Sequence, residues 1–154
     1  MGDLHPTVER LRERLEAAGL EVDMQELERS TRTAAEAAAA VGCELGQIVK
    51  SLVFVADGGP VLCLCSGDRR VDTARLGNDV RQASADEVRA ATGYAIGGVP
   101  PLGHDPPLRT LVDSGLLRFR RVWCAAGTPN ALFEVESEAL VAALPDGEVR
   151  DIAR

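Results

Sequence analysis

The segment IVKSLVFVADGGPVLCLCS, residues 48–66, constrains the fold more than any other part of the chain. It holds two runs of apolar and β-branched residues, and such runs favour strands. The Asp-Gly-Gly sequence between them is typical of the tight turn of a β-hairpin. We therefore expect an antiparallel hairpin here, with Lys50 near the start of its first strand.

Helix signals precede this hairpin. Apolar residues recur at helical spacing over residues 7–18, and Gly19 follows them as a stop. In STRTAAEAAAAVG, Thr33 and Glu36 have the spacing of a capping box, and Gly42 ends the alanine-rich run. The sequence therefore predicts two helices ahead of the hairpin.

Helix and strand patterns mix in the rest of the chain. VDTARLG predicts a short helix, and SADEVRAATG predicts a longer one with Ser84 and Glu87 as its capping box. LRTLVDSG, FRRVWCAAG and ALFEVE favour strands, GTPN favours a turn, and SEALVAAL predicts a closing helix capped by Ser137. Because these patterns show no regular βαβ alternation, we predict an α+β fold on a curved antiparallel or mixed sheet.

Length and composition indicate a globular protein. A chain of 154 residues fits one domain, which we place at residues 1–154. Hydrophobic residues make up 45% and charged residues 27%, and no apolar run reaches the roughly 18 residues of a membrane span. The charged N-terminal sequence is unlike a signal peptide. We expect a cytoplasmic protein with no membrane partner.

The cysteines do not predict a metal or redox site. Cys43, Cys63, Cys65 and Cys124 form no CxxC pair, and the two histidines stand apart from each other. Cys63 and Cys65 share one face of a strand, where they are poorly placed to bridge each other. We expect unbridged thiols, no metal and no cofactor.

The net charge of -7 argues against a protein that coats nucleic acid by electrostatics alone. Local basic groups occur in the sequence, and solvated faces explain most clusters of that kind. Their members are Arg69, Arg70 and Arg75 in one group and Arg118, Arg120 and Arg121 in the other. A small contact with nucleic acid stays open.

Lys50 is the only lysine among 17 basic residues. An ammonium is a compact point charge and a guanidinium is a wide planar fork, so a site shaped for one rejects the other. A surface cation in this chain is expected to be arginine. We therefore predict that Lys50 belongs to a site.

The loop YAIGGVPPLGHDPP, residues 94–107, is the second candidate. Paired glycines allow backbone N–H groups to approach a ligand, and the prolines that follow stiffen the loop. We expect the stretch Gly97–Pro101 to line the same pocket as Lys50. A rigid structural turn is the alternative, and the motif by itself does not decide between them.

Taken together, several segments resemble the YbaK/prolyl-tRNA-synthetase-associated editing domain family. They are TAAEAAAAVGCELGQIVKSLVF, GDRRVDTARLG, SADEVRAATGYAIGGVPPLGH and AAGTPNALFEVESEAL, and the resemblance runs from about Thr33 to Asp151. It implies a mixed, largely antiparallel, barrel-like sheet with surrounding helices. It also implies a trans-editing hydrolase that deacylates mischarged aminoacyl-tRNA, with an Ala-, Cys- or Ser-type amino acid on a tRNA such as that for proline.

The resemblance also implies the site residues. The essential lysine of the family falls on Lys50, as the catalytic residue, and its substrate loop falls on Gly97, Gly98, Val99 and Pro100. The implied partners are the aminoacyl-tRNA 3′ end and an aminoacyl-tRNA synthetase. No Ser-His-Asp or Cys-His arrangement is apparent. The nucleophile is then a water placed by the ribose hydroxyl or, for a cysteinyl substrate, its own thiol.

The sequence departs from some alanine-specific relatives, which leaves the amino acid open. Those relatives carry His-Pro where this chain has Ala125–Gly127, and Asn where it has Ser51. We expect His104 and Asn130 to be structural before they are site residues. The alternative reading of the whole chain is a non-catalytic nucleotide- or tRNA-end-binding module, because a shared fold does not establish catalysis.

Overall fold

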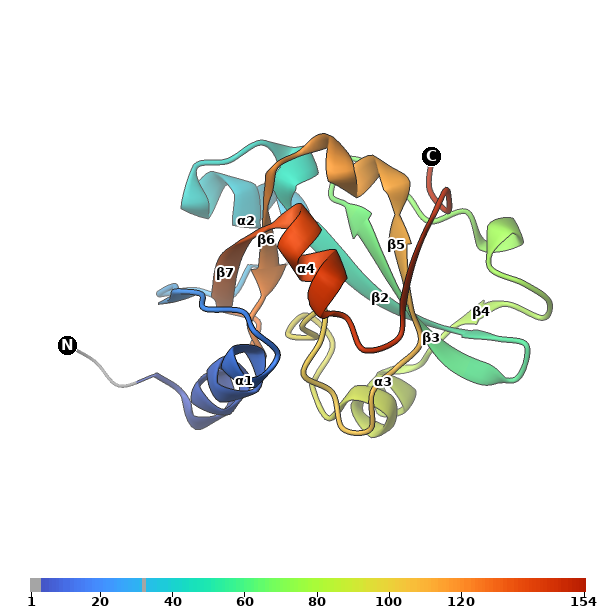
Figure 1. Ribbon diagram of the computed structural model, residues 1–154, viewed down its shortest axis with the longest axis horizontal. Helices are drawn as coiled ribbons and strands as arrows, with labels where there is room; N and C mark the ends of the chain where they lie inside the picture. The colour runs from blue at the N-terminus through green and yellow to red at the C-terminus, as the bar shows by residue number, and fades with distance from the viewer. Residues whose placement is uncertain (1–3, 32) are drawn as a thin grey trace.

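The computed structural model describes residues 4–31 and 33–154, and these form four α-helices and two sheets (Figure 1). The larger sheet has the strand order β4-β2-β3-β5-β8, and the smaller has the order β1-β7-β6. The strands of the larger sheet are β2 (Val49–Ala56), β3 (Gly59–Ser66), β4 (Arg81–Gln82), β5 (Thr110–Asp113) and β8 (Gly147–Arg150). Those of the smaller sheet are β1 (Met24–Glu26), β6 (Arg121–Ala125) and β7 (Ala131–Glu136).

Strand pairing confirms the predicted α+β fold with a mixed, largely antiparallel sheet. The β2–β3, β2–β4, β1–β7 and β6–β7 pairs are antiparallel, whereas β3–β5 and β5–β8 are parallel. A single bridge between Ile48 and Trp123 joins the two sheets. Within the described part of the chain, no further ladder closes them into one barrel.

The predicted hairpin is confirmed. β2 and β3 pair along their whole length, and Asp57 and Gly58 form the connection with φ angles of 53° and 83°. Two successive positive φ values are what a two-residue hairpin turn requires, because they match the right-handed twist of the strands. Lys50 is the second residue of β2 and pairs with Cys65.

The helices begin and end largely at the predicted residues. They are α1 (Pro6–Ala17), α2 (Ala34–Val41), α3 (Ala85–Thr92) and α4 (Ser137–Ala143), with short 3-10 turns η1 (Leu45–Gln47), η2 (Thr73–Arg75) and η3 (Ser114–Arg118). The Thr33 side chain caps α2, and Ser84 and Glu87 form the capping box of α3. None of the helices in the described ranges has the length and apolar content that a membrane crossing requires.

The predicted cap of α4 is wrong. The N-cap residue is Glu136, without a side-chain cap bond, and Ser137 is the first helical residue. Ser137 is buried, and its hydroxyl donates to the carbonyl oxygen of Phe119 at 2.6 Å. A buried hydroxyl needs a partner, and the nearby carbonyl supplies one, so Ser137 joins the helix to the end of η3 instead of capping it.

Side chains of β2 and β3 alternate between two apolar clusters. Val49, Val53 and Leu62 belong to the main cluster, which also holds the buried residues of α1. Phe54 and Cys63 belong to a second cluster on the other face of the sheet. Since residues that pair across an antiparallel ladder share a face, Lys50 extends from the face that carries Cys65.

Candidate functional site

A cavity of about 390 Å³ lies beside the first half of β2. Its lining comes from the segment that leads into α2, the first turns of α2, the first half of β2, the segment that leads into α3, and the loop that contains Gly97. The residues are Thr31, Thr33, Ala34, Ala37, Ile48, Val49, Lys50, Ser51, Leu52, Val53, Gln82, Ala83, Val88, Ile96, Gly97, Val99, Ala125 and Leu132. Its volume falls in the range of small-molecule sites.

The cavity runs along one edge of β2. Five successive residues of the strand, Val49 to Val53, line it, although successive side chains of a strand point to opposite faces. On this edge β4 pairs only with Phe54 and Val55, so the stretch from Val49 to Val53 has no strand partner there among the described residues. An edge of this kind leaves room for a ligand beside the main chain.

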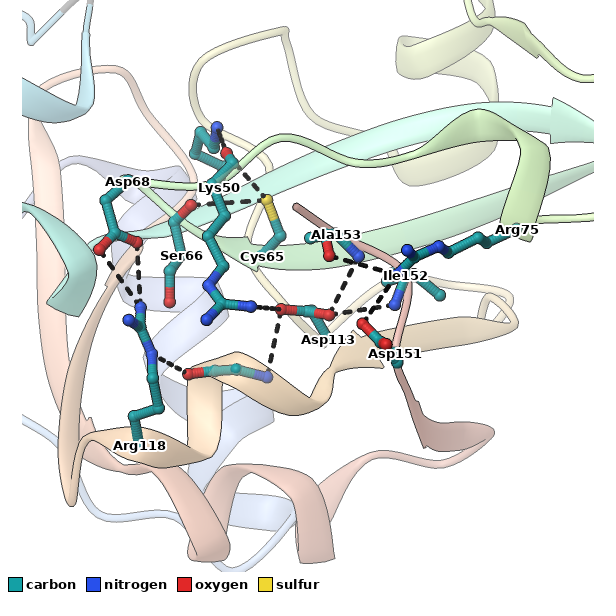
Figure 2. Close-up of polar contacts among 12 residues, drawn as sticks. Lys50, Cys65, Ser66, Asp68, Arg75, Asp113, Arg118, Asp151, Ile152 and Ala153 are labelled. Atoms are coloured by element: carbon teal, nitrogen blue, oxygen red, sulfur yellow. Dashed lines mark hydrogen bonds and ion pairs between the residues drawn. The ribbon is translucent and has the colours of Figure 1, made fainter.

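The Lys50 ammonium is held by a backbone carbonyl (Figure 2). Its Nζ donates a hydrogen bond to the carbonyl oxygen of Arg69, and Lys50 is half-buried. An ammonium has three N–H donors, and no second protein acceptor is found for it within the described ranges. Lys50 lines the cavity, and its ammonium has N–H donors left for a ligand.

The Arg69 carbonyl is itself fixed in place. The Arg69 guanidinium lies 3.9 Å from a carboxylate oxygen of Asp113, a residue with no exposed surface. The same carboxylate accepts from the backbone N–H groups of Gly115, Ile152 and Ala153 at 3.0 to 3.2 Å (Figure 2). These three N–H donors satisfy the buried carboxylate, so Asp113 anchors the segment that holds Lys50.

The structure brings part of the predicted loop to the cavity. Gly97 and Val99 line it together with Lys50, but Gly98 and Pro100 do not. The Gly98 carbonyl oxygen accepts from the N–H of Gly127 at 3.0 Å, which joins the loop to the turn after β6. Gly98 therefore supports the cavity wall without lining the cavity itself.

His104 and Asn130 have structural contacts. His104 is buried, its Nε2 lies 2.8 Å from the carbonyl oxygen of Pro100, and burial lowers its pKa. The Asn130 side chain donates to the carbonyl oxygen of Leu27 at 2.9 Å and accepts from the Thr128 hydroxyl. Neither residue lines the cavity, and His104 supports the loop from its far side.

Sequence patterns did not predict several polar residues of the cavity. Thr31, Thr33 and Gln82 line it, and Thr33 is recognisable in the sequence only as a helix cap. The Ser51 hydroxyl is buried in the cavity wall and finds no hydrogen-bond partner in the described part of the protein. A buried hydroxyl without a partner is costly, so the Ser51 hydroxyl would gain by rotating towards a polar group of a ligand.

The cysteines are unbridged, and no three His, Cys, Asp or Glu side chains gather into a metal site in residues 4–31 and 33–154. Burial raises the pKa of the Cys63 thiol to about 12 and raises that of Cys124. Burial also raises the pKa of Cys65, although the nearby Lys50 charge opposes the rise. Since the thiolate is the reactive form, these three thiols should be inert near neutral pH.

A thiol titration checks this. With an aromatic disulfide reagent at about pH 8, where raised pKa values keep thiols protonated, we expect at most the partly exposed Cys43 to react in the folded protein. All four thiols should react after denaturation. Rapid labelling of two or more thiols in the native protein would contradict the assignment of Cys63, Cys65 and Cys124 to the core.

Comparisons with known proteins agree on one family. The sequence profile of the aminoacyl-tRNA editing domain matches residues 28–143. The chain is 37% identical over 127 residues to the uncharacterized Bacillus subtilis protein YwhH, and this match covers 78% of this chain and 80% of YwhH. It is 42% identical over 64 residues to the proline–tRNA ligase of Lactobacillus gasseri, a match that covers 38% of this chain and 11% of the ligase.

A solved structure covers almost the whole fold. The crystal structure of "a putative trans-editing enzyme for prolyl tRNA synthetase" superposes with a TM-score of 0.91 at 47% identity, covering 99% of each chain. The profile match and the structural match together define the class of this protein as an aminoacyl-tRNA editing domain. The chain belongs to the aminoacyl-tRNA editing domain family, as the resemblance of its motifs predicted.

Proposed function

We propose that this protein is an aminoacyl-tRNA deacylase that hydrolyses the ester of a mischarged tRNA in the cavity beside β2. The observation that carries the proposal is the placement of Lys50, the only lysine, in one cavity with Gly97 and Val99. Membership in the editing domain family supports the reaction class. We further propose that residues 1–154 act as one editing domain.

In this reaction the Lys50 ammonium stabilises charge at the ester. A water molecule attacks the carbonyl carbon, the carbonyl oxygen takes up negative charge, and the bond to the ribose oxygen then breaks. The leaving ribose oxygen takes a proton, and the amino acid is released as a carboxylate. A fixed positive charge at the developing oxyanion lowers this barrier, because it needs no reorganisation at the moment of reaction.

The attacking water is proposed to be positioned by the ribose hydroxyl of the substrate. The ionisable side chains that line the cavity are limited to Lys50 in the described ranges, so the cavity itself offers no general base. A cysteinyl substrate has a second route, in which its own thiol attacks the ester. In both routes the Lys50 ammonium stabilises the negative charge that develops on the carbonyl oxygen.

The proposed amino acid is small, as the family resemblance implies, and it would meet largely apolar walls. Ala34, Ala37 and Ala125 are small, and Val53 and Val88 are apolar. The unpartnered Ser51 hydroxyl is proposed to bond the α-amino group or a small polar side chain. Alanine, serine and cysteine fit these walls.

The acidic surface supports a second partner. A net charge of -7 gives little long-range attraction for the body of a tRNA. We infer that the protein grips the 3′ end and that an aminoacyl-tRNA synthetase holds the rest.

A deacylation panel tests the proposed function. Proline tRNA charged with alanine, cysteine, serine or proline is incubated with excess protein, and release of the labelled amino acid is followed in a single turnover. We expect release above the spontaneous rate for at least one of the three small amino acids and none for proline. Binding of the tRNA without release of any amino acid would instead support a non-catalytic module.

A further inference from the structure

A second cavity, of about 620 Å³, lies on the other side of the wall that Gly98 supports. It is lined by α1, the end of α3, and the segments 93–95 and 127–129. Figure 1 shows α1 and α3 along the lower side of the molecule. None of its lining residues belongs to the first cavity.

Three arginines line this second cavity. Arg10 and Arg14 lie one turn apart on α1, and Arg89 lies near the end of α3. Arg14 donates to the carbonyl oxygen of Gly103 at 2.7 Å. The Tyr94 hydroxyl donates to the same carbonyl oxygen at 3.1 Å, so the Arg14 guanidinium and the Tyr94 hydroxyl meet at one acceptor.

These arginines differ from most others in having no carboxylate partner. Ion pairs engage seven arginines of the described chain, namely Arg12, Arg69, Arg75, Arg81, Arg118, Arg121 and Arg150. No such pair within the described ranges includes Arg10, Arg14 or Arg89. The cavity has a single acidic lining residue, Asp105. Three guanidinium groups against one carboxylate make a local positive site on an acidic protein.

The two cavities share a wall only a few atoms thick. Gly97 contributes to the first cavity and Pro129 to the second, and a methyl group on Gly97 would lie 3.8 Å from Pro129. Thr31 of the first cavity donates its N–H to the carbonyl oxygen of Pro129 at 3.0 Å. The two cavities therefore lie close together at Gly97 and Pro129, as the binding of one strand across both would require.

We propose that Arg10, Arg14 and Arg89 bind a backbone phosphate of the RNA strand whose 3′ end carries the ester in the first cavity. The inference rests on the proposed function and adds to it the contact that positions the strand. A guanidinium presents paired donors that match phosphate oxygens. Phosphate contacts hold register and orientation without reading sequence.

Binding of uncharged RNA tests the inference. The probe is a fluorescein-labelled RNA hairpin with a single-stranded CCA 3′ end, and its Kd is measured by anisotropy over a range of salt. Arg10→Ala and Arg89→Ala should each raise Kd about tenfold, as expected for one charged hydrogen bond. Each should also lower the salt dependence by about 0.7 in the slope of log Kd against log salt.

Arg120→Ala is the matched control, because Arg120 is exposed, forms no ion pair in the described structure and lines neither cavity. It should leave Kd and the slope unchanged. A second RNA carries a neutral methylphosphonate at one linkage near its 3′ end. At the contacted position it should bind the unmodified protein about tenfold more weakly, and Arg10→Ala should then cause little further loss.

Unchanged RNA binding by both Arg10→Ala and Arg89→Ala would overturn the inference. Evidence for a site that binds only free anions would also overturn it. In that case inorganic phosphate would raise the melting temperature of the native protein but not of Arg10→Ala, while the two proteins would bind the RNA equally well. The probe carries no amino acid, so absence of deacylation would leave this test intact. Conversely, deacylation with normal RNA affinity in both variants would reject the phosphate site alone.

Discussion

Lys50→Arg should reduce single-turnover deacylation by about 10²–10³, nearly as much as Lys50→Met. The Lys50 ammonium reaches the Arg69 carbonyl from a half-buried position at the cavity edge. A guanidinium is wider and planar, so it cannot take the same place even though its charge is the same. Loss of rate in both variants therefore distinguishes a fitted ammonium from a general positive charge.

The measurement is release of the amino acid from the best substrate of the panel, with thermal unfolding as the control for folding. Lys50→Met retains most of the apolar stem and removes the charge, so a fall in rate at unchanged stability reports on the ammonium itself. A near-normal rate for folded Lys50→Arg would reject the fitted site. A near-normal rate for Lys50→Met would remove Lys50 from the reaction.

Gly98→Ala is expected to lower deacylation by about 10²-fold and stability by about 1–3 kcal/mol. A methyl group on Gly98 would lie 2.8 Å from the carbonyl oxygen of Gly127 and 2.9 Å from the Cα of Thr128. Both atoms belong to the backbone, which cannot rotate away as a side chain can. The loop must therefore move away from the turn, and Gly97 and Val99 move with it.

Gly59→Ala provides the matched control for this substitution. A methyl group there meets nothing within 4 Å, and Gly59 has no positive φ, so its stability and rate should stay close to those of the natural chain. Urea unfolding and single-turnover release measure the two effects separately. If Gly98→Ala had the same stability and deacylation rate as Gly59→Ala, the close approach of the loop to Gly127 would not matter for stability or activity.

The parts of the fold that could be predicted are those with local signals. The hairpin turn at Asp57 and the caps at Thr33 and Ser84 depend on neighbouring residues, and the structure confirms them. β1, β4 and β8 span only two to four residues and show no alternation long enough to detect. The parallel pairing of β5 with β3 and β8 joins distant segments, which no local pattern specifies.

The candidate site divides in the same way. Lys50 was predicted from composition and from the family resemblance, and Gly97 from the resemblance of its loop, and both line one cavity. Thr31 and Gln82 have no distinctive local pattern. Their roles in the reaction stay predictions.

The basic groups show the limit of reading charge along the sequence. Arg69, Arg75, Arg118 and Arg121 from the two local groups are engaged by carboxylates. The unpaired cluster instead combines Arg10 and Arg14 with Arg89, which are far apart in the chain. Only the tertiary fold, which places α1 and the end of α3 around one cavity, brings them together.

The contact between Lys50 and the Arg69 carbonyl also affects how tightly the proposed site can hold an unreacted ester. A neutral ester oxygen that bonds one of the remaining N–H donors of this ammonium would replace a water molecule there, one neutral acceptor for another, so it would gain little affinity. An oxygen that carries negative charge would be a much stronger acceptor than the Arg69 carbonyl. The hydrogen bond from Lys50 to the substrate oxygen would then strengthen as the tetrahedral intermediate forms, so Lys50 would stabilise the transition state more than the bound substrate.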